Sequence, residues 1–191
     1  MCGIAGIMYK ESRLTGLAPI GDELVKMLDT MVHRGHDSAG VTISGESFDS
    51  DLLIRIWADE SAPAADTIER AKETLAINGG AIVSAETRDS YLRLTANYEG
   101  DVPRLADALL KTPGVVLHSI GENSEVIKDV GTPMVIDERH EIKKISGTHG
   151  VGHVRMATES AVDISHAHPF WAYPFTDITV VHNGQLTNYH G

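Results

Sequence analysis

The feature that most constrains the fold is a regular alternation of strand-like and helix-like segments in the middle of the chain. Runs rich in apolar and β-branched residues alternate with segments whose apolar residues recur every three or four positions. The expected order is strand 52–57, helix 65–77, strands 81–87 and 91–98, helix 102–110 and strand 114–120. This βαββαβ order predicts a ferredoxin-like sheet covered on one face by two helices.

The segments on either side of this stretch have a different composition and a different spacing of apolar residues. Composition changes near residues 46–50, so we expect residues 50–130 to be an inserted subdomain within one domain of residues 1–191. The flanks are predicted to contain strand 2–9, helix 21–33 with Asp22 as its N-cap, and strands 41–43, 134–136, 150–155 and 178–181. The expected fold class is therefore α+β.

Composition narrows the class of protein and of partner. A chain of 191 residues with 42% hydrophobic residues can bury a sizeable core. Its formal net charge of -11 argues against nucleic acid or an anionic membrane as partner, because both bind clustered positive charge. No apolar run is long enough to span a bilayer, and no basic stretch precedes the first apolar residues as in a signal peptide. A cytoplasmic protein is expected.

The single cysteine stands at position 2. One thiol excludes an internal disulfide framework and any multi-cysteine metal site. Removal of Met1 would place the thiol, with a usual pKa of about 8.5, beside a free α-amino group with a usual pKa of about 8. Proton transfer between the two would be nearly balanced, so Cys2 would carry its own base. Behind a retained Met1, the thiol would instead be a small buried apolar group.

Four short motifs resemble those of the class II glutamine amidotransferases. They are residues 2–6 (CGIAG), 33–40 (HRGHDSAG), 152–158 (GHVRMAT) and 181–184 (VHNG), and a supporting match, 167–169 (AHP), lies between the last two. The resemblance covers residues 1–45 and 131–191. It implies an Ntn-hydrolase-type αββα four-layer sandwich, hydrolysis of L-glutamine, no cofactor, and transfer of ammonia to an acceptor (synthase) domain or subunit.

The catalytic residues implied by this resemblance are Cys2, Asn183 and Gly184. The Cys2 thiolate would attack the side-chain amide of glutamine to give a γ-glutamyl thioester and ammonia, and water would then release glutamate. Asn183 and Gly184 would donate a side-chain and a backbone N–H to the oxyanion. Taken alone, Asn-Gly is also a common hairpin turn.

The resemblance also implies a substrate pocket and a supporting loop. A planar guanidinium at Arg155 can hold the α-carboxylate of glutamine through two parallel hydrogen bonds, and Thr158 and His168 would complete the pocket. Arg34, Gly35 and Asp37 match the motif that supports the loop near the nucleophile. For isolated residues, a surface salt bridge at Arg155 and a loop hydrogen bond at His168 are the ordinary interpretations.

Three departures from the family pattern bear on the acceptor. His36 stands where many members have proline or another residue, and Met156 and Glu159 replace a tryptophan and a histidine that are common in members that form sugar phosphates. These changes favour a glutamate synthase-like system over a hexosamine-type acceptor. In members of this family an acidic residue well downstream of the Asn-Gly pair holds the substrate α-amino group, and this sequence ends at Gly191. A truncated chain or an incomplete pocket is the resulting expectation.

Two alternatives belong to other classes of protein. A divalent metal could bind an H-x-H pair with nearby side chains, but the spacing fits no defined site, so no metal is expected. The residues concerned are His153, Glu159, Asp163, His166, His168 and His182. The second alternative is a non-catalytic regulatory or assembly subunit that uses the surface of the inserted subdomain.

Overall fold

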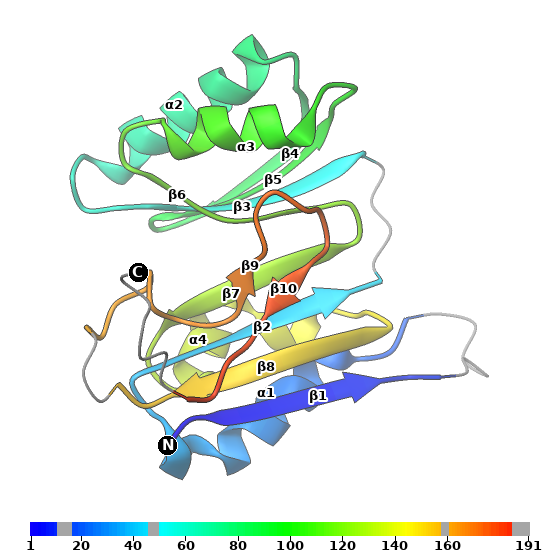
Figure 1. Cartoon of the computed structure of the whole chain (residues 1–191), viewed down its shortest axis with the longest axis vertical. Coiled ribbons are helices and arrows are strands. Elements are labelled where there is room, and N and C mark those ends of the chain that lie inside the picture. The colour runs from blue at the N-terminus through cyan, green and yellow to red at the C-terminus, as the bar shows by residue number, and fades with distance from the viewer. Residues whose placement is uncertain (11–16, 46–49, 158–160, 185–191) are drawn as a thin grey trace.

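The protein has an α+β fold with antiparallel sheets, seen in a computed structural model that describes residues 1–10, 17–45, 50–157 and 161–184 (Figure 1). Two four-stranded sheets meet at an edge strand of the first, and helices cover one face of each sheet (Figure 1). The part of the chain that is described contains no helix long and apolar enough to cross a membrane.

The first sheet has the strand order β1-β8-β2-β7, and all neighbours are antiparallel. Its strands are β1 (Gly3–Met8), β8 (His149–Arg155), β2 (Ser38–Ser44) and β7 (Ser124–Val130), and the helices on its outer face are α1 (Ile20–Thr30) and α4 (Pro133–His140). Ile20, Leu24 and Leu28 recur at intervals of four along α1 and are fully buried. This apolar stripe holds α1 against the sheet.

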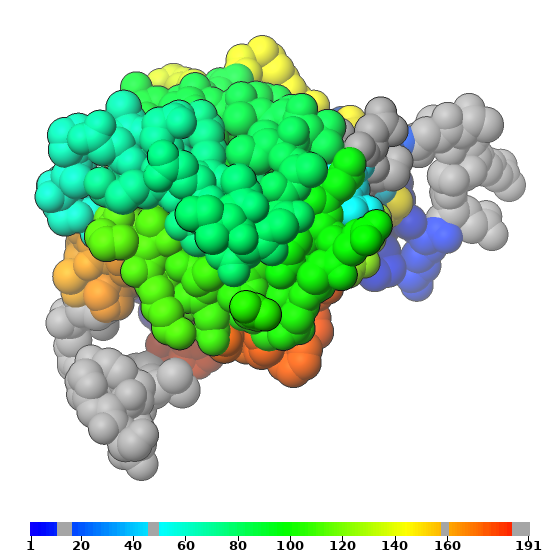
Figure 2. Space-filling view, turned by 90° about the horizontal axis from the view of Figure 1, so that it is seen from above, coloured from blue at the N-terminus to red at the C-terminus, as the bar shows by residue number. Residues whose placement is uncertain are grey.

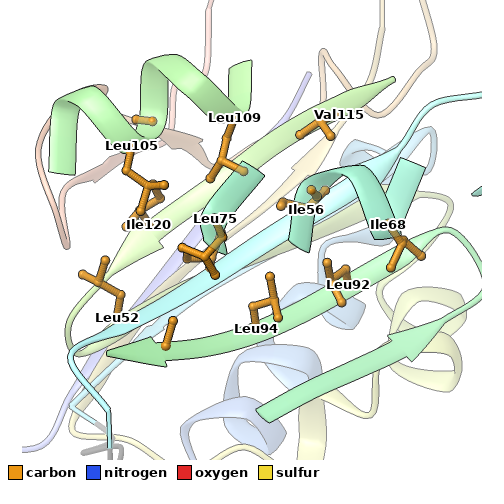
Figure 3. Close-up of a cluster of buried hydrophobic side chains, with 14 of the residues drawn as sticks. Leu52, Ile56, Ile68, Leu75, Leu92, Leu94, Leu105, Leu109, Val115 and Ile120 are labelled. Atoms are coloured by element: carbon orange, nitrogen blue, oxygen red, sulfur yellow. The ribbon is translucent and has the colours of Figure 1, made fainter. Parts of the chain in front are cut away.

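The second sheet has the strand order β4-β5-β3-β6. Its strands are β3 (Leu52–Ala58), β4 (Ala81–Arg88), β5 (Tyr91–Asn97) and β6 (Val115–Gly121), and its helices are α2 (Ala64–Ile77) and α3 (Val102–Leu110). Alternate residues of the strands, such as Leu92 and Leu94, point toward Leu75, Leu105 and Leu109 on the helices (Figure 3). Figure 2, viewed from above, shows α2 and α3 spread over this end of the molecule.

The secondary structure predicted for residues 52–120 is confirmed to within one residue at every boundary. This stretch leaves the first sheet after β2 and returns to it at β7. The last pair of the ladder joins Ser44 to Ser124, and the Gly45 N–H donates to the Asn123 carbonyl at 2.8 Å just beyond it. The departing and returning chains are therefore neighbours.

The prediction of a strand at 134–136 is wrong, because these residues lie in α4. Pro133 occupies the first turn, where a missing N–H costs nothing, and Ile136 turns inward to the core of the first sheet. Three consecutive apolar residues fit either a strand or one helical turn. Pro133 at the start of the segment favours the helix.

The N-cap assignment in the first helix is also wrong. Pro19 occupies the cap position of α1, and Asp22 lies in the first turn, where it accepts a hydrogen bond from Lys26 at 2.6 Å. The helix ends at Thr30, and a short 3-10 helix, η1 (Val32–Arg34), completes the predicted span.

Two strands differ from expectation in the later half of the chain. β7 was not predicted, because its buried residues include Glu125, Lys128 and Asp129, which are seldom buried in strands. The strand predicted at 178–181 is reduced to β10 (Thr179–Val180), which pairs with β9 (Phe170–Trp171).

Replacing Gly21 by Ala is expected to destabilise the protein even though Ala favours helices by about 1 kcal/mol. A Cβ at this position would lie 1.8 Å from the carbonyl oxygen of Ile142, which is backbone and cannot move aside alone. We expect a net loss of roughly 2 kcal/mol in the free energy of unfolding, measured by urea denaturation. Gly6→Ala is the control, since its Cβ would meet its nearest atom, Gly150 O, at 3.7 Å; an equal loss in both variants would contradict the argument.

Candidate active site

Cys2 lies immediately before β1, at an edge of the first sheet. Gly3 is paired with Val154 on β8, so the next position along the ladder sets Cys2 beside Arg155. Because side chains alternate along a strand, Cys2 shares a face of the sheet with Arg155 and His153, opposite the face that packs on α1. The thiol and the guanidinium therefore face the same side of the sheet.

Residues from three other segments converge on Cys2. Its half-buried thiol lies 3.9 Å from the Met156 carbonyl oxygen. Its own carbonyl oxygen accepts hydrogen bonds from Arg34 Nε at 3.2 Å and from Asn183 Nδ2 at 2.9 Å. Cys2, Arg34 and Asn183 line a shallow open hollow, with Gly3, Ile4, Met31 and His33.

The segment after η1 fixes the chain next to the thiol. Gly35 packs so closely on Arg155 that an added Cβ would lie 2.5 Å from its carbonyl carbon. The Asp37 N–H donates to the Arg155 carbonyl at 3.1 Å, and the Asp37 carboxylate accepts the Ala157 N–H at 2.7 Å. Gly35 and Asp37 thus fix the backbone of residues 155–157.

Arg155 is buried, with 6% of its surface exposed, and its Nη1 donates to the Ala161 carbonyl at 3.0 Å. The guanidinium is therefore buried and not on the surface. Two residues named in the sequence analysis, Thr158 and Glu159, lie outside the described residues.

His168 packs over the same face of the sheet, next to His153. Its ring stacks on His153, with centroids 4.3 Å apart, and His153 Nε2 is 3.0 Å from the His182 carbonyl. On β2, Gly40 provides the space: an added Cβ would lie 2.3 Å from the His168 carbonyl oxygen. Lys128 on β7 secures the same segment by donating to the Ala167 carbonyl at 2.8 Å.

Burial lowers the pKa values of His153, His168 and Lys128. It lowers the pKa of His153 to about 4 and, with a further contribution from His153, lowers the pKa of His168 to about 3. Burial likewise lowers the pKa of Lys128 to about 8. Both histidines are neutral at pH 7, and within the described residues the buried Nδ1 atom of each has no hydrogen-bond partner.

The structure thus brings Cys2, Arg34, Gly35, Asp37, Arg155 and Asn183 together. His168 reaches this group through His153, and Gly184 is exposed beside the ring of His182. Sequence analysis did not predict the structural roles of Met156 and Lys128 in this site. Met156 lay in a motif but meets the thiol through its backbone, and nothing in the sequence pattern placed Lys128 opposite Gly40.

Two of the residues considered for a metal, Asp163 and His166, contact each other. His166 Nδ1 is 2.7 Å from an Asp163 carboxylate oxygen, and both side chains are substantially exposed. Within residues 1–10, 17–45, 50–157 and 161–184, no three His, Cys, Asp or Glu side chains are grouped so that they could share a metal ion.

The stacked histidines predict a pH dependence of stability. A group whose pKa falls on folding takes up more protons when unfolded, so its stabilisation is complete above pH 6.5 and is lost as the pH falls toward about 4 for His153 and about 3 for His168. Between pH 7 and pH 5, wild type should lose about 1 kcal/mol more than His168→Gln, after allowance for partial exposure. Urea denaturation at both pH values measures this, with exposed His36→Gln as control; equal losses in wild type and His168→Gln would refute it.

Comparison with known proteins gives relatives along nearly the whole chain, although no family model matches it. A candidate glutamine amidotransferase of Methanothermobacter thermautotrophicus is 37% identical over 99% of this chain and 63% of its own length. The glutamine amidotransferase-like protein GlxB of Rhizobium meliloti is 34% identical over 100% of this chain and 60% of its own length. Amidophosphoribosyltransferase of Escherichia coli is 41% identical over 29% of this chain and 11% of its own length.

The chain therefore spans about three-fifths of the length of the two relatives that match it throughout. Its similarity to glutamine amidotransferase-like proteins covers all the segments that meet at Cys2.

Proposed function

We propose that this chain is the glutaminase part of a class II glutamine amidotransferase and that Cys2 is its nucleophile. The observation that carries the proposal is the convergence on Cys2 of Arg34, Met156 and Asn183, which are far apart in sequence. The similarity to glutamine amidotransferase-like proteins supports the same activity. The substrate is L-glutamine, and the products are glutamate and ammonia.

The chemistry begins with removal of Met1, which is 77% exposed and so accessible to an aminopeptidase. The freed α-amino group takes the thiol proton, and the thiolate attacks the side-chain amide carbon of glutamine. The tetrahedral intermediate collapses with loss of ammonia to leave a γ-glutamyl thioester on Cys2. Water then attacks the thioester, which releases glutamate and restores the thiol.

The roles that we propose for the residues around Cys2 follow from their positions. Asn183 Nδ2 lies within hydrogen-bonding distance of the nucleophilic residue, so a small rotation directs it to the oxyanion, and the Gly184 N–H is the second donor. Arg155 binds the α-carboxylate, Thr158 and His168 complete the pocket, and Arg34, Gly35 and Asp37 hold the surrounding backbone.

The finer fold assignment belongs to the same proposal. The first sheet with α1 and α4 forms part of an Ntn-hydrolase-type sandwich, and β3 to β6 with α2 and α3 form an inserted ferredoxin-like subdomain. We place the end of the insertion after Gly121, because β7 pairs with β2 in the first sheet. Ammonia passes to an acceptor domain or subunit, with glutamate synthase-like chemistry as its destination.

Active-site labelling tests the nucleophile. Intact-mass analysis before and after 6-diazo-5-oxo-norleucine, an electrophilic glutamine mimic, should show loss of Met1 and one adduct that peptide sequencing maps to Cys2. Cys2→Ser should remain unlabelled. Efficient removal of Met1 with an unmodified Cys2 would overturn the proposal and favour a regulatory or assembly subunit.

Two substitutions separate transition-state stabilisation from substrate binding. Asn183→Ala should lower kcat about 10²- to 10³-fold with little change in KM, because the oxyanion exists only during the reaction. Arg155→Lys should mainly raise KM, because the α-carboxylate is bound throughout. Glutamate release in the presence of the acceptor subunit measures both, and a fall in kcat from Arg155→Lys with none from Asn183→Ala would contradict the assigned roles.

A further inference from the structure

The oxyanion donors proposed above lie at the end of a segment, residues 177–184, that crosses the first sheet on the face opposite α1 (Figure 1). Near the end of this segment, the His182 carbonyl is 3.0 Å from His153 Nε2 on β8. Asn183 Nδ2 then donates to the Cys2 carbonyl at 2.9 Å, just before β1. The segment thus ends at the edge of the sheet that carries the nucleophile.

The segment begins at the opposite edge of the same sheet, where Asp177 binds the turn between β6 and β7. Asp177 Oδ1 accepts the backbone N–H groups of Glu122 and Asn123 at 2.9 and 3.0 Å. The same oxygen accepts the hydroxyl of Ser124, the first residue of β7, at 2.9 Å. One carboxylate oxygen therefore gathers three donors from three consecutive residues.

The turn that Asp177 binds is itself attached to the first sheet. The Asn123 carbonyl accepts the Gly45 N–H at 2.8 Å, next to the end of β2. Gly121 allows the carboxylate to come close, since an added Cβ would lie 2.6 Å from Asp177 Oδ1. Asp177 has a φ of 61°, in the left-handed region that Gly, Asn and Asp adopt more readily than other residues. The start of the segment is therefore fixed in position.

The crossing leaves the segment little slack. It runs from β7 to β1 and from the level of one end of the seven-residue strand β2 to the level of the other. With a spacing of about 4.8 Å between strands and a rise of about 3.3 Å per residue, this diagonal is about 25 Å long. The chain from Asp177 to Asn183 reaches at most about 20–22 Å when extended, so the side chains at its two ends complete the distance. The contact between, from the Thr42 hydroxyl to Thr179 Oγ1 at 2.9 Å, adds no length.

We propose that Asp177 is a positioning residue for Asn183 and Gly184, because it fixes the start of the extended segment at whose end both donors lie. The inference rests on the proposed glutaminase function and adds a residue that lies outside all the sequence motifs. An oxyanion donor stabilises a charge that exists only during the reaction, so its placement affects the transition state more than the bound substrate. Loss of the Asp177 contacts therefore lowers kcat and leaves KM nearly unchanged.

Two variants at position 177 test this role, because Gly and Asn both tolerate the left-handed backbone conformation. Asp177→Gly removes the carboxylate and should lower kcat for glutamate release about tenfold or more, with KM within about twofold of wild type. Asp177→Asn keeps an oxygen at the position of Oδ1, where the three donors meet, and should retain kcat within about threefold. A wild-type kcat in Asp177→Gly would overturn the proposal.

Tyr173→Phe is the matched control. Tyr173 lies between β9 and β10, and its hydroxyl donates to Asp107 on α3 at 2.5 Å. The variant therefore also removes a contact between this hairpin and the second sheet with its helices, but at a point before the segment that carries the donors. Its kcat should equal that of wild type. An equal fall in kcat in Tyr173→Phe and Asp177→Gly would indicate a general loosening of the hairpin and would overturn the proposal.

Hydrogen–deuterium exchange gives a readout that does not depend on activity. Peptides that cover residues 178–184 should exchange roughly threefold faster in Asp177→Gly than in wild type, whereas peptides from α1 should be unchanged. Asp177→Asn and Tyr173→Phe should exchange like wild type in both regions. A wild-type chain that releases no glutamate would refute the glutaminase function, whereas unchanged exchange and unchanged kcat in Asp177→Gly, with an active wild type, would refute the role of Asp177 alone.

Discussion

The arrangement of the candidate site depends on the position of β8 between β1 and β2. Because β8 pairs with both neighbours, one ladder sets Cys2 beside Arg155, and the other sets Arg155 opposite Ser38. Gly35 and Asp37, which precede β2, then contact the residues that follow β8. A shift of one residue in either register would turn the Cys2 or Arg155 side chain to the opposite face of the sheet. The packing of α1 on that opposite face fixes the register, since Gly152 and Val154 must face the helix.

The face that does not pack on α1 is polar to an unusual degree. Lys128, His153 and Arg155 are all buried on it, and each is held by a backbone carbonyl, of Ala167, His182 and Ala161 respectively. These carbonyls belong to the segment after β8, so the polar side chains position that segment over the sheet. Desolvation is the cost, visible in the lowered pKa values of Lys128 and His153. The hydrogen bonds recover part of this cost and specify one placement of the segment, which an apolar face would not do.

Sequence periodicity was sufficient for the second sheet and insufficient for parts of the first. In β3 to β6 the apolar residues alternate because one face meets α2 and α3, so every element could be predicted. β7 could not, because its buried Glu125, Lys128 and Asp129 are stabilised by partners distant in sequence, including Arg55, Ala167 and Arg139. For the site, the motifs identified Cys2, Arg155 and Asn183, but only tertiary structure places His153 between Arg155 and His168. The contact between the thiol and the Met156 carbonyl could not be predicted either, because any residue type at position 156 provides the same backbone carbonyl.

The join between the two sheets has a topological consequence. The pair Ser44 and Ser124 closes the β2–β7 ladder, and Gly45 bonds to Asn123 just past it. In terms of connectivity, β2 and β7 are the arms of a single hairpin, and everything from Gly45 to Asn123 occupies the place of its loop. Loop-closure entropy grows only slowly with length, so a complete α+β unit can replace a short turn without altering the register of the arms. The second sheet can therefore vary in size and sequence among related chains while the geometry at Cys2 stays the same.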